Sequence, residues 1–448
     1  MLVFISDLHF VDGTAEEHNL SPRALEYFFD DLVSIANKPS NNIKEIKLVL
    51  LGDIFDLIRT EHWFGYPADE RPWGTNEHAI EVHAQTLFDA IVDYNENQED
   101  PITHEKWQTF TKFRQWVTDL PNRCNLDTEV RLFYLPGNHD RLVNRYRSLR
   151  EKVCIKLGIP PAWHNPEDPF PNIYEDQAYG VFARHGHEYD KYNYEGGTTY
   201  TWEDYQRVPI GDPITTELVA RLPYALFRRL DAIPDMTTED KLRVKRNFQE
   251  IENVRPLSAT IEWLLYKVRQ TRQLKEIIED TVQEVIDYFE DLEFVKNWYA
   301  RHDKWTSWQD EADKMQAFLF LLRNFKLYRT EKLWDLAMQA RNYFMQDDLL
   351  AAAPHEFDHL DSQRIRYVVY GHTHDPLLSA VRSIPNPPTP IDQVYLNTGT
   401  WRGRFFRATQ NDSFIFWKNM TYIIFYREVE RDNPYPVFET WTGSLKTV

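Results

Sequence analysis

Leu2-Val3-Phe4-Ile5-Ser6-Asp7-Leu8-His9 joins a short apolar run to two polar side chains of the kinds that bind metal ions. Short apolar runs that end in polar or glycine-containing sequence are typical of buried strands. The same arrangement occurs four more times along the chain. The later apolar runs are 46–51, 130–135, 180–183 and 367–370, and the clusters after them are Gly52-Asp53, Gly137-Asn138-His139-Asp140, Arg184-His185-Gly186-His187 and Gly371-His372-Thr373-His374.

These five polar clusters predict an α/β fold with one site. In open α/β sheets, ligands bind in the crevice outside the carboxyl ends of the strands, and each cluster follows a predicted strand. Side chains alternate with a period of two along an extended chain, so we expect Asp7 and His9 to point to the same side. The same reasoning applies to His372 and His374. We therefore expect the clusters to meet in one crevice.

Two long segments do not follow this rhythm of strands, and we interpret both as inserts. Segment 58–129 is polar and carries aromatic residues near its start. Segment 215–347 predicts several amphipathic helices, because its apolar residues recur at helical spacing. That spacing is seen in two sets, Ile261, Leu264, Leu265 and Val268, and Leu274, Ile277, Ile278, Val282, Val285, Ile286 and Phe289. The sequence leaves open whether this helical insert is a lid, a dimer interface or a buttress.

The length and charge of the chain limit its organisation and its partners. A chain of 448 residues has room for two or three domains, but inserts explain the excess length equally well, and we interpret 1–448 as a single domain. The formal net charge of −19 argues against nucleic acid as a partner, because nonspecific binding requires Lys and Arg to neutralise phosphates.

The cysteines and the hydropathy pattern bear on the expected location. Only Cys124 and Cys154 occur, which we interpret as free thiols in a reducing compartment. The first residues lack the basic start and cleavage site of a secretory signal, and no apolar run reaches the roughly 18 residues that span a bilayer. We therefore expect a cytoplasmic protein with no transmembrane segment.

The clusters supply carboxylates, imidazoles and one amide, which are the ligands that a pair of divalent first-row ions prefers. Thiolate ligands are absent from them, which argues against a purely structural zinc site. Mn, Fe, Ni and Zn all fit such ligands, so the identity of the two ions stays open.

Taken together and in this order, the clusters resemble the five motifs of the calcineurin-like metallophosphoesterase superfamily. The motifs are Asp7-Leu8-His9, Gly52-Asp53-Ile54-Phe55-Asp56, Gly137-Asn138-His139-Asp140, His185 and Gly371-His372-Thr373-His374. The resemblance covers about 1–57, 130–190 and 366–400. It implies a four-layer α/β/β/α metallophosphoesterase sandwich, here with a large helical insert. The opening motif and the His-Gly pair look more like the UDP-2,3-diacylglucosamine pyrophosphatase branch, whose substrate we do not transfer.

The resemblance also implies a role for each motif residue. One divalent ion would be held by Asp7, His9 and His374, the other by Asn138, His185 and His372, with Asp53 bridging both. His139 would stabilise or protonate the leaving oxygen, Asp140 would orient its ring, and Asp56 would fix a ligand imidazole. The nucleophile would be a bridging water converted to hydroxide.

The implied activity is that of a metal-dependent phosphoric ester hydrolase acting on a phosphodiester, a pyrophosphate or a phosphomonoester. The substrate would be a small molecule or lipid-linked. Pro136 stands where Ser/Thr protein phosphatases of the superfamily carry an arginine, and this difference argues against a protein-phosphatase role. Arg59, Arg141, Arg145 and Arg402 follow predicted strand ends and are candidates for binding a phosphate or a second anionic group.

Several alternatives stay open from the sequence. The chain could be a non-catalytic scaffold that uses the helical insert as a partner surface. The helical insert could also be the contact of a homo-oligomer. A nuclease of the same superfamily is a third hypothesis, which the acidic charge disfavours. His187 competes with His185 as the lone-histidine ligand. The aromatic residues at 189–205 could form a substrate wall or simply pack.

Overall fold

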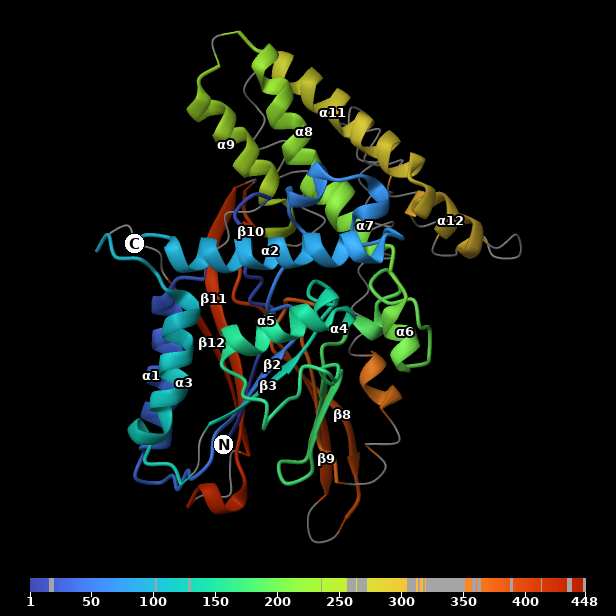
Figure 1. Ribbon diagram of the computed structural model, residues 1–448. Coiled ribbons are helices and arrows are strands. Elements are labelled where there is room, and N and C mark those ends of the chain that lie inside the picture. The colour runs from blue at the N-terminus through green and yellow to red at the C-terminus, as the bar shows by residue number, and fades with distance from the viewer. Residues whose placement is uncertain are drawn as a thin grey trace.

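The computed structural model describes residues 1–15, 20–100, 103–127, 130–234, 236–255, 263, 272–303, 312, 315–316, 319, 351–356, 360, 364–386, 390–411, 413–432 and 437–445 (Figure 1). Two mixed sheets lie in the body of the molecule, and a group of helices projects from one end of it. The predicted α/β class is confirmed.

The first sheet contains the first three predicted strands, which run parallel. β1 (Leu2–Ile5) pairs with β2 (Lys47–Leu51), and β2 pairs with β3 (Arg131–Leu135). The order in this sheet is β3-β2-β1-β11-β10-β6, with β12 paired to β11. The remaining strands are β6 (Val254–Arg255), β10 (Gly403–Arg407), β11 (Phe414–Phe425) and β12 (Phe438–Leu445).

The second sheet has the order β4-β5-β7-β9-β8 and contains the other two predicted motif strands. β5, β7 and β9 run parallel, while β4 and β8 are antiparallel edge strands. Their bounds are β4 (Ile173–Asp176), β5 (Val181–Arg184), β7 (Tyr367–Tyr370), β8 (Leu377–Ile384) and β9 (Ile391–Asn397).

The two sheets pack face to face, because alternate residues of each strand are apolar on the inner side. Leu2 and Phe4 of β1 point into the layer between the sheets, whereas Val3 and Ile5 point to the helices outside. The ring of Phe4 lies 5.9 Å from that of Tyr174 across this layer. Each such fully buried side chain is worth about 1.5–3 kcal/mol. The carboxyl ends of β1, β2, β3, β5 and β7 are thereby held at one edge.

Four helices cover the outer face of the first sheet. They are α1 (Pro22–Ala36), α2 (Glu77–Asn97), α3 (Thr109–Arg123) and α5 (Arg147–Leu157). α1 begins where the Ser21 side chain accepts from the backbone of Arg23, with Pro22 at the first helical position. α4 (Leu142–Arg145) precedes α5 directly.

Segment 58–129, which the sequence predicted to be an insert, contributes to the main apolar core. It provides α2 and α3, whose buried faces belong to the same apolar cluster as β1, β2 and β3. In α2 the buried residues include Ile80, Ala84, Leu87 and Ile91 at helical spacing. The many charged residues between them masked this amphipathic pattern in the sequence.

The described part of segment 215–347 is mainly helical, as predicted, and it also contains the short strand β6. The helices here are α8 (Arg221–Arg229), α9 (Thr238–Gln249), α11 (Arg272–Asp291) and α12 (Glu293–His302), which follow α6 (Trp202–Gln206), α7 (Gly211–Pro213) and a π-helix (Ile214–Ala220). Leu274, Ile278, Val285 and Phe289 of α11 are buried against α8 and its neighbours. Thr237 caps α9 by accepting from the backbone of Asp240 at 3.1 Å. The predicted set at 261–268 and most of 304–347 lie outside the described residues.

Shorter elements complete the chain. The 3-10 turns are His62–Gly65, Ala68–Glu70, His187–Tyr189, Leu230–Ala232, Ile251–Asn253, Ala353–His355 and Glu428–Glu430. Ala353, Leu360 and Ile365 pack on the outer face of the second sheet. Cys124 and Cys154 are both buried and form no disulfide. Among the described helices, none has the length and apolar character needed to cross a membrane.

Candidate metal centre

The five polar clusters meet at one edge of the two sheets. Within the described residues, three groups of side chains bring possible ligand atoms within 4.8 Å of one another. The groups are Asp7, His9, Asp53 and His374; Asp53, His185 and His372; and His9, Asp56 and His139. Every residue in them comes from a predicted motif, and the three groups overlap through Asp53 and His9.

The backbone reaches this arrangement by a different route from the one predicted. β1 ends at Ile5 and β7 at Tyr370, so the ligand pairs are not part of extended strands. Instead, five of the predicted ligands have left-handed φ angles, namely Asp7 (52°), His9 (46°), Asp53 (53°), His372 (68°) and His374 (63°). This conformation costs about 1–3 kcal/mol for a non-glycine residue and is concentrated at functional sites. The prediction that each pair reaches one crevice holds, but its stated reason was wrong.

The first group surrounds a point between two imidazole rings. Nε2 of His9 lies 3.0 Å from Nε2 of His374, which lies 3.3 Å from Oδ1 of Asp7. Nδ1 of His9 faces Oδ2 of Asp56 at 3.3 Å, so the ring proton belongs on Nδ1 and Nε2 keeps its lone pair. Oδ1 of Asp7 is buried and has no hydrogen-bond partner among the described residues. Nε2 of His9 and Oδ1 of Asp7, which lie 3.9 Å apart, thus direct electron pairs into the same space, which suits a cation.

The second group is built in the same way. Nδ1 of His185 lies 2.8 Å from the carbonyl oxygen of Leu51, which can only accept, so Nδ1 donates and Nε2 points into the site. Nδ1 of His372 lies 3.0 Å from Oδ1 of Asn138, while its Nε2 lies 3.0 Å from a carboxylate oxygen of Asp190. The Asp190 carboxylate accepts a hydrogen bond from Nε2–H, so Nδ1 of His372 carries no proton. This nitrogen and the amide oxygen of Asn138 therefore face each other as two acceptors. The predicted ligand set of the second ion is therefore brought together.

Asp53 stands between the two groups. Its Oδ1 accepts the backbone N–H of His139 at 2.8 Å. Its Oδ2 lies 3.2 Å from Nε2 of His185 and 3.8 Å from Nε2 of His9. One carboxylate oxygen therefore faces a histidine of each group, which is the placement that a bridging ligand requires.

Two glycines make this close approach possible. A Cβ on Gly52 would lie 2.3 Å from Nδ1 of His185, and the residue also has a φ of +84°. A Cβ on Gly137 would lie 2.2 Å from Oδ1 of Asp53. Any side chain at either position would displace a predicted ligand.

The protonation equilibria reflect the crowding of charge. Burial lowers the pKa of His185, but the adjacent Asp53 carboxylate outweighs it and raises that pKa to about 10. Burial likewise raises the pKa of Asp53, but His185 and His139 hold it well below its usual range. Burial raises the pKa of Asp7, and the charge of Asp53 adds to this effect. A metal ion bound here would compete with a proton for Nε2 of His185.

Asp56 holds two imidazole rings in place. Its Oδ1 lies 2.9 Å from Nδ1 of His139, and its Oδ2 faces the ring of His9. The carboxylate is anchored in turn by the backbone N–H of Arg59 at 2.9 Å. Burial raises the pKa of Asp56, but His139 holds it well below its usual range. The contact with the His9 ring is the one predicted for Asp56.

Asp140 does not orient the ring of His139, and this prediction was wrong. Its carboxylate accepts from the backbone of Gly137 at 2.5 Å, from the backbone of Ile54 at 2.9 Å and from the hydroxyl of Tyr134 at 2.6 Å. It thus ties the loop after β3 to the loop after β2. The sequence could not reveal this, because adjacency to His139 suggested a contact that Asp56 makes instead.

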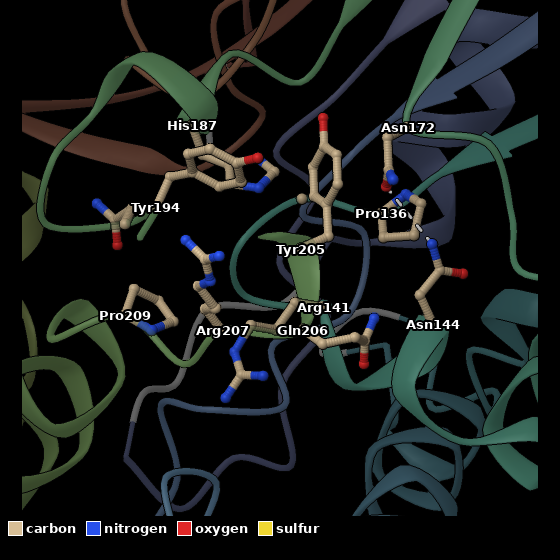
Figure 2. A pocket seen from close by; sticks show the side chains of 12 residues that line it. Pro136, Arg141, Asn144, Asn172, His187, Tyr194, Tyr205, Gln206, Arg207 and Pro209 are labelled. Atoms are coloured by element: carbon tan, nitrogen blue, oxygen red, sulfur yellow. Dashed lines mark hydrogen bonds between the residues drawn. The ribbon is translucent and has the colours of Figure 1, made fainter. Parts of the chain in front are cut away.

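His187 lies beside the centre, while His185 belongs to it. The ring centroids of the two are 5.4 Å apart, and only His185 falls in a group of converging ligand atoms. Burial lowers the pKa of His187 to about 4. Its ring lines a pocket with Tyr194, Tyr205 and Arg207, shown in Figure 2.

The sequence reasoning missed Asp190. Its carboxylate binds Nε2 of His372 and accepts from Nδ2 of Asn193 at 2.7 Å. Burial raises the pKa of Asp190, but the bonds to His372 and Asn193 hold it below its usual range. Asn193 also accepts from Nδ2 of Asn138 at 3.3 Å, which fixes the orientation of that amide. No spacing signal pointed to this loop, since an acidic residue among tyrosines is unremarkable in sequence.

Most of the other candidates make ion pairs or hydrogen bonds within the protein. Arg141 pairs with Asp212, and Arg145 pairs with Glu77. Arg59 and Arg402 are buried, and Arg59 donates to the backbone oxygen of Gln249. Among the aromatic residues, Trp63 is fully buried, and the hydroxyls of Tyr189 and Tyr205 donate to Glu356 and Glu188.

No protein-family model matches the chain, and no curated protein is similar to it in sequence.

Proposed function

We propose that this chain is a two-metal phosphoesterase that hydrolyses a phosphodiester, a pyrophosphate or a phosphomonoester. The observation that carries the proposal is the position of Asp53, whose Oδ2 faces His185 in one ligand group and His9 in the other. A shared carboxylate between two sets of convergent acceptors is what a pair of divalent ions requires.

The fold is compatible with this proposal. Two facing sheets, with helices outside the first and residues 353–365 packed outside the second, agree with the four-layer α/β/β/α sandwich that the motifs imply. We include that architecture, and membership of the calcineurin-like metallophosphoesterase superfamily, in the proposal.

The residues present fit two divalent ions of the Mn, Fe, Ni or Zn type. One would be held by Asp7, His9, Asp53 and His374, the other by Asp53, Asn138, His185 and His372. A buried carboxylate oxygen that has no hydrogen-bond donor among the described residues, Oδ1 of Asp7, supports this fit. Two such ions polarise a phosphoryl group and lower the pKa of water.

His139 is the group we assign to the leaving oxygen. Its side chain is 13% exposed, more open than those of Asp56 and His9 beneath it. With Nδ1 held by Asp56, the ring can present Nε2 to a departing alkoxide or phosphate and donate a proton to it. Asp56 keeps the ring in the orientation and tautomer that this donation requires. Asp190 does the same for the ligand ring of His372.

The experiment is a hydrolysis screen with phosphodiesters, nucleotide sugars and phosphomonoesters, in the presence of each candidate metal. We expect activity that a chelator abolishes and that falls by at least about 100-fold in Asp53→Asn and His139→Ala. The control is His78→Ala, because His78 is exposed on α2 and far in sequence from every motif. His139→Ala should keep two equivalents of metal, whereas Asp53→Asn should lose them.

Full activity in both variants would contradict the mechanism. A stable protein that binds no metal and hydrolyses nothing would favour the non-catalytic scaffold instead.

A further inference from the structure

Arg404 is a buried arginine beside the candidate metal centre that the proposed chemistry does not yet use. It lies on β10 and is 2% exposed, and its Nη1 pairs with Oδ1 of Asp375. Asp375 directly follows the predicted ligand His374, and its side chain is 54% exposed. In the part of the chain that the structure describes, the guanidinium thus pairs with one carboxylate, which lies toward solvent.

Two nitrogen atoms of this guanidinium, Nε and Nη2, have no hydrogen-bond partner among the described residues. Both atoms are buried. Nε–H and Nη2–H point in parallel from the same edge of the planar group, and this fork matches two oxygens of a carboxylate or phosphoryl group. No described residue thus accepts a hydrogen bond from either N–H of this pair on Arg404.

The segment that carries Arg404 is attached to the candidate metal centre. Oγ1 of Thr400 donates to the backbone oxygen of Asp7 at 2.7 Å, and the backbone N–H of Arg402 donates to the same Oγ1 at 3.2 Å. Burial lowers the pKa of Arg404, while the Asp375 and Asp7 carboxylates raise it. The guanidinium is therefore within electrostatic reach of a predicted metal ligand.

A buried cationic fork is costly unless something accepts from it. Leaving charged donors without acceptors costs more than leaving neutral ones, and arginine cannot lose its proton to avoid this cost. A second buried guanidinium, Arg402, lies close enough to oppose the charge on Arg404. An anion that accepted hydrogen bonds from Nε and Nη2 of Arg404 would remove this cost.

We propose that the Nε/Nη2 fork of Arg404 binds two oxygens of a phosphoryl group of the substrate, with Asp375 holding the guanidinium in place from its other side. This inference rests on the proposed function, since it makes Arg404 the anion-binding residue of the same site. The phosphoryl group is either the one hydrolysed or a second one next to it.

The experiment measures binding of inorganic phosphate to the metal-loaded full chain by calorimetry, and its inhibition constant in hydrolysis. Arg404→Lys keeps the charge and the aliphatic stem but loses the parallel fork, so phosphate affinity should fall by about tenfold or more. Arg407→Gln removes an exposed charge from the same strand and is the matched control. Metal content and melting temperature should be unchanged in the control and near the wild-type values in Arg404→Lys.

Asp375→Asn provides the complementary variant. It removes a negative charge that competes with phosphate while leaving an amide oxygen to accept from Nη1, so phosphate affinity should rise. If Arg404→Lys folds poorly, the Asp375→Asn result alone decides the question. Unchanged phosphate affinity in Asp375→Asn, or in a folded, metal-loaded Arg404→Lys, would overturn the inference.

Two further results separate the possibilities. If Arg404→Lys lowers the efficiency of hydrolysis of monoesters and pyrophosphates alike, the fork binds the hydrolysed phosphoryl group; if only pyrophosphates are affected, it binds the second one. Phosphate binding that depends on Arg404 in a protein without hydrolytic activity would refute the proposed function but keep the anion site. Hydrolysis that does not change when Arg404 is substituted would keep the proposed function but refute the anion site at Arg404.

Discussion

Nε2 of His9 and Nε2 of His374 lie 3.0 Å apart, although 365 positions separate the two residues in the chain. Because Nδ1 of His9 faces Asp56, the Nε2 atom directed at His374 carries a lone pair. Oδ1 of Asp7 lies 3.3 Å from the same nitrogen of His374. Such a set of acceptors is stable only when a proton or a metal ion lies among them.

Metal ions should therefore stabilise the fold. A ligand that binds only the native state adds about 2.7 kcal/mol to the free energy of unfolding when its concentration is 100 times its Kd. We expect Mn or Zn to raise the melting temperature of the chelator-treated protein by a few degrees. The double variant His9→Gln, His374→Gln should show a much smaller rise. Equal shifts in both proteins would mean that the ions bind elsewhere.

Asp190→Asn should weaken metal binding without unfolding the protein. The carboxylate of Asp190 fixes the proton of His372 on Nε2 and so directs Nδ1 toward Asn138. Loss of such a supporting partner typically lowers metal affinity by about 10–100-fold. Competition with a coloured chelator measures the change. Asp119→Asn, at an exposed position of α3, is the matched control and should leave the affinity unaltered.

The two cysteines should react slowly with thiol reagents in the native state. Burial raises the pKa of Cys124 and of Cys154 to about 11. A raised thiol pKa means that the neutral form persists at pH 8, and only the thiolate reacts. Relative to an ordinary thiol, we expect labelling by a disulfide reagent at pH 8 to be roughly 100-fold slower or more. Denaturant should release two fast-reacting thiols, and rapid labelling without denaturant would contradict the burial.

The sequence was sufficient to predict which clusters meet. Apolar runs such as 46–51 and 130–135 predicted the strands, and polar residues at the ends of those strands predicted the edge where they converge. This worked because burial of a strand on both faces leaves a continuous apolar signal. The helical spacing at 272–291 was informative for the same reason, since a period of 3.6 residues survives in any helix that packs on one face.

Other features depend on contacts that spacing does not encode. The left-handed φ angles at Asp7 and His374 arise because tertiary packing overrides local preference. α2 was obscured because its solvent-facing side is highly charged. Asp190 contacts His372 and Arg404 contacts Asp375, and both of these partners are distant in the chain. A single residue type in a loop or strand carries no pattern that would reveal such a contact.

Asp140 provides the clearest test of how far adjacency in sequence misleads. Its carboxylate accepts from Gly137, Ile54 and Tyr134, all buried. The carboxylate that faces Nδ1 of His139 is that of Asp56. Asp140→Ala would leave several donors without acceptors, each at a cost of about 1–3 kcal/mol. We therefore expect the free energy of unfolding in urea to fall by about 3 kcal/mol or more.

Tyr134→Phe serves as the control for this prediction, because it removes one donor and leaves the carboxylate with its backbone partners. It should cost only about 1 kcal/mol. If Asp140 acted on the His139 ring, Asp140→Asn would lower turnover at unchanged stability. If Asp140 instead holds the two loops together, the free energy of unfolding and the metal content fall, and turnover falls because metal is lost. Metal content and turnover of the Asp140→Asn protein, measured at increasing urea concentration, distinguish the two roles. If Asp140 holds the two loops together, metal is lost at the urea concentration at which the loop at Gly137 loosens.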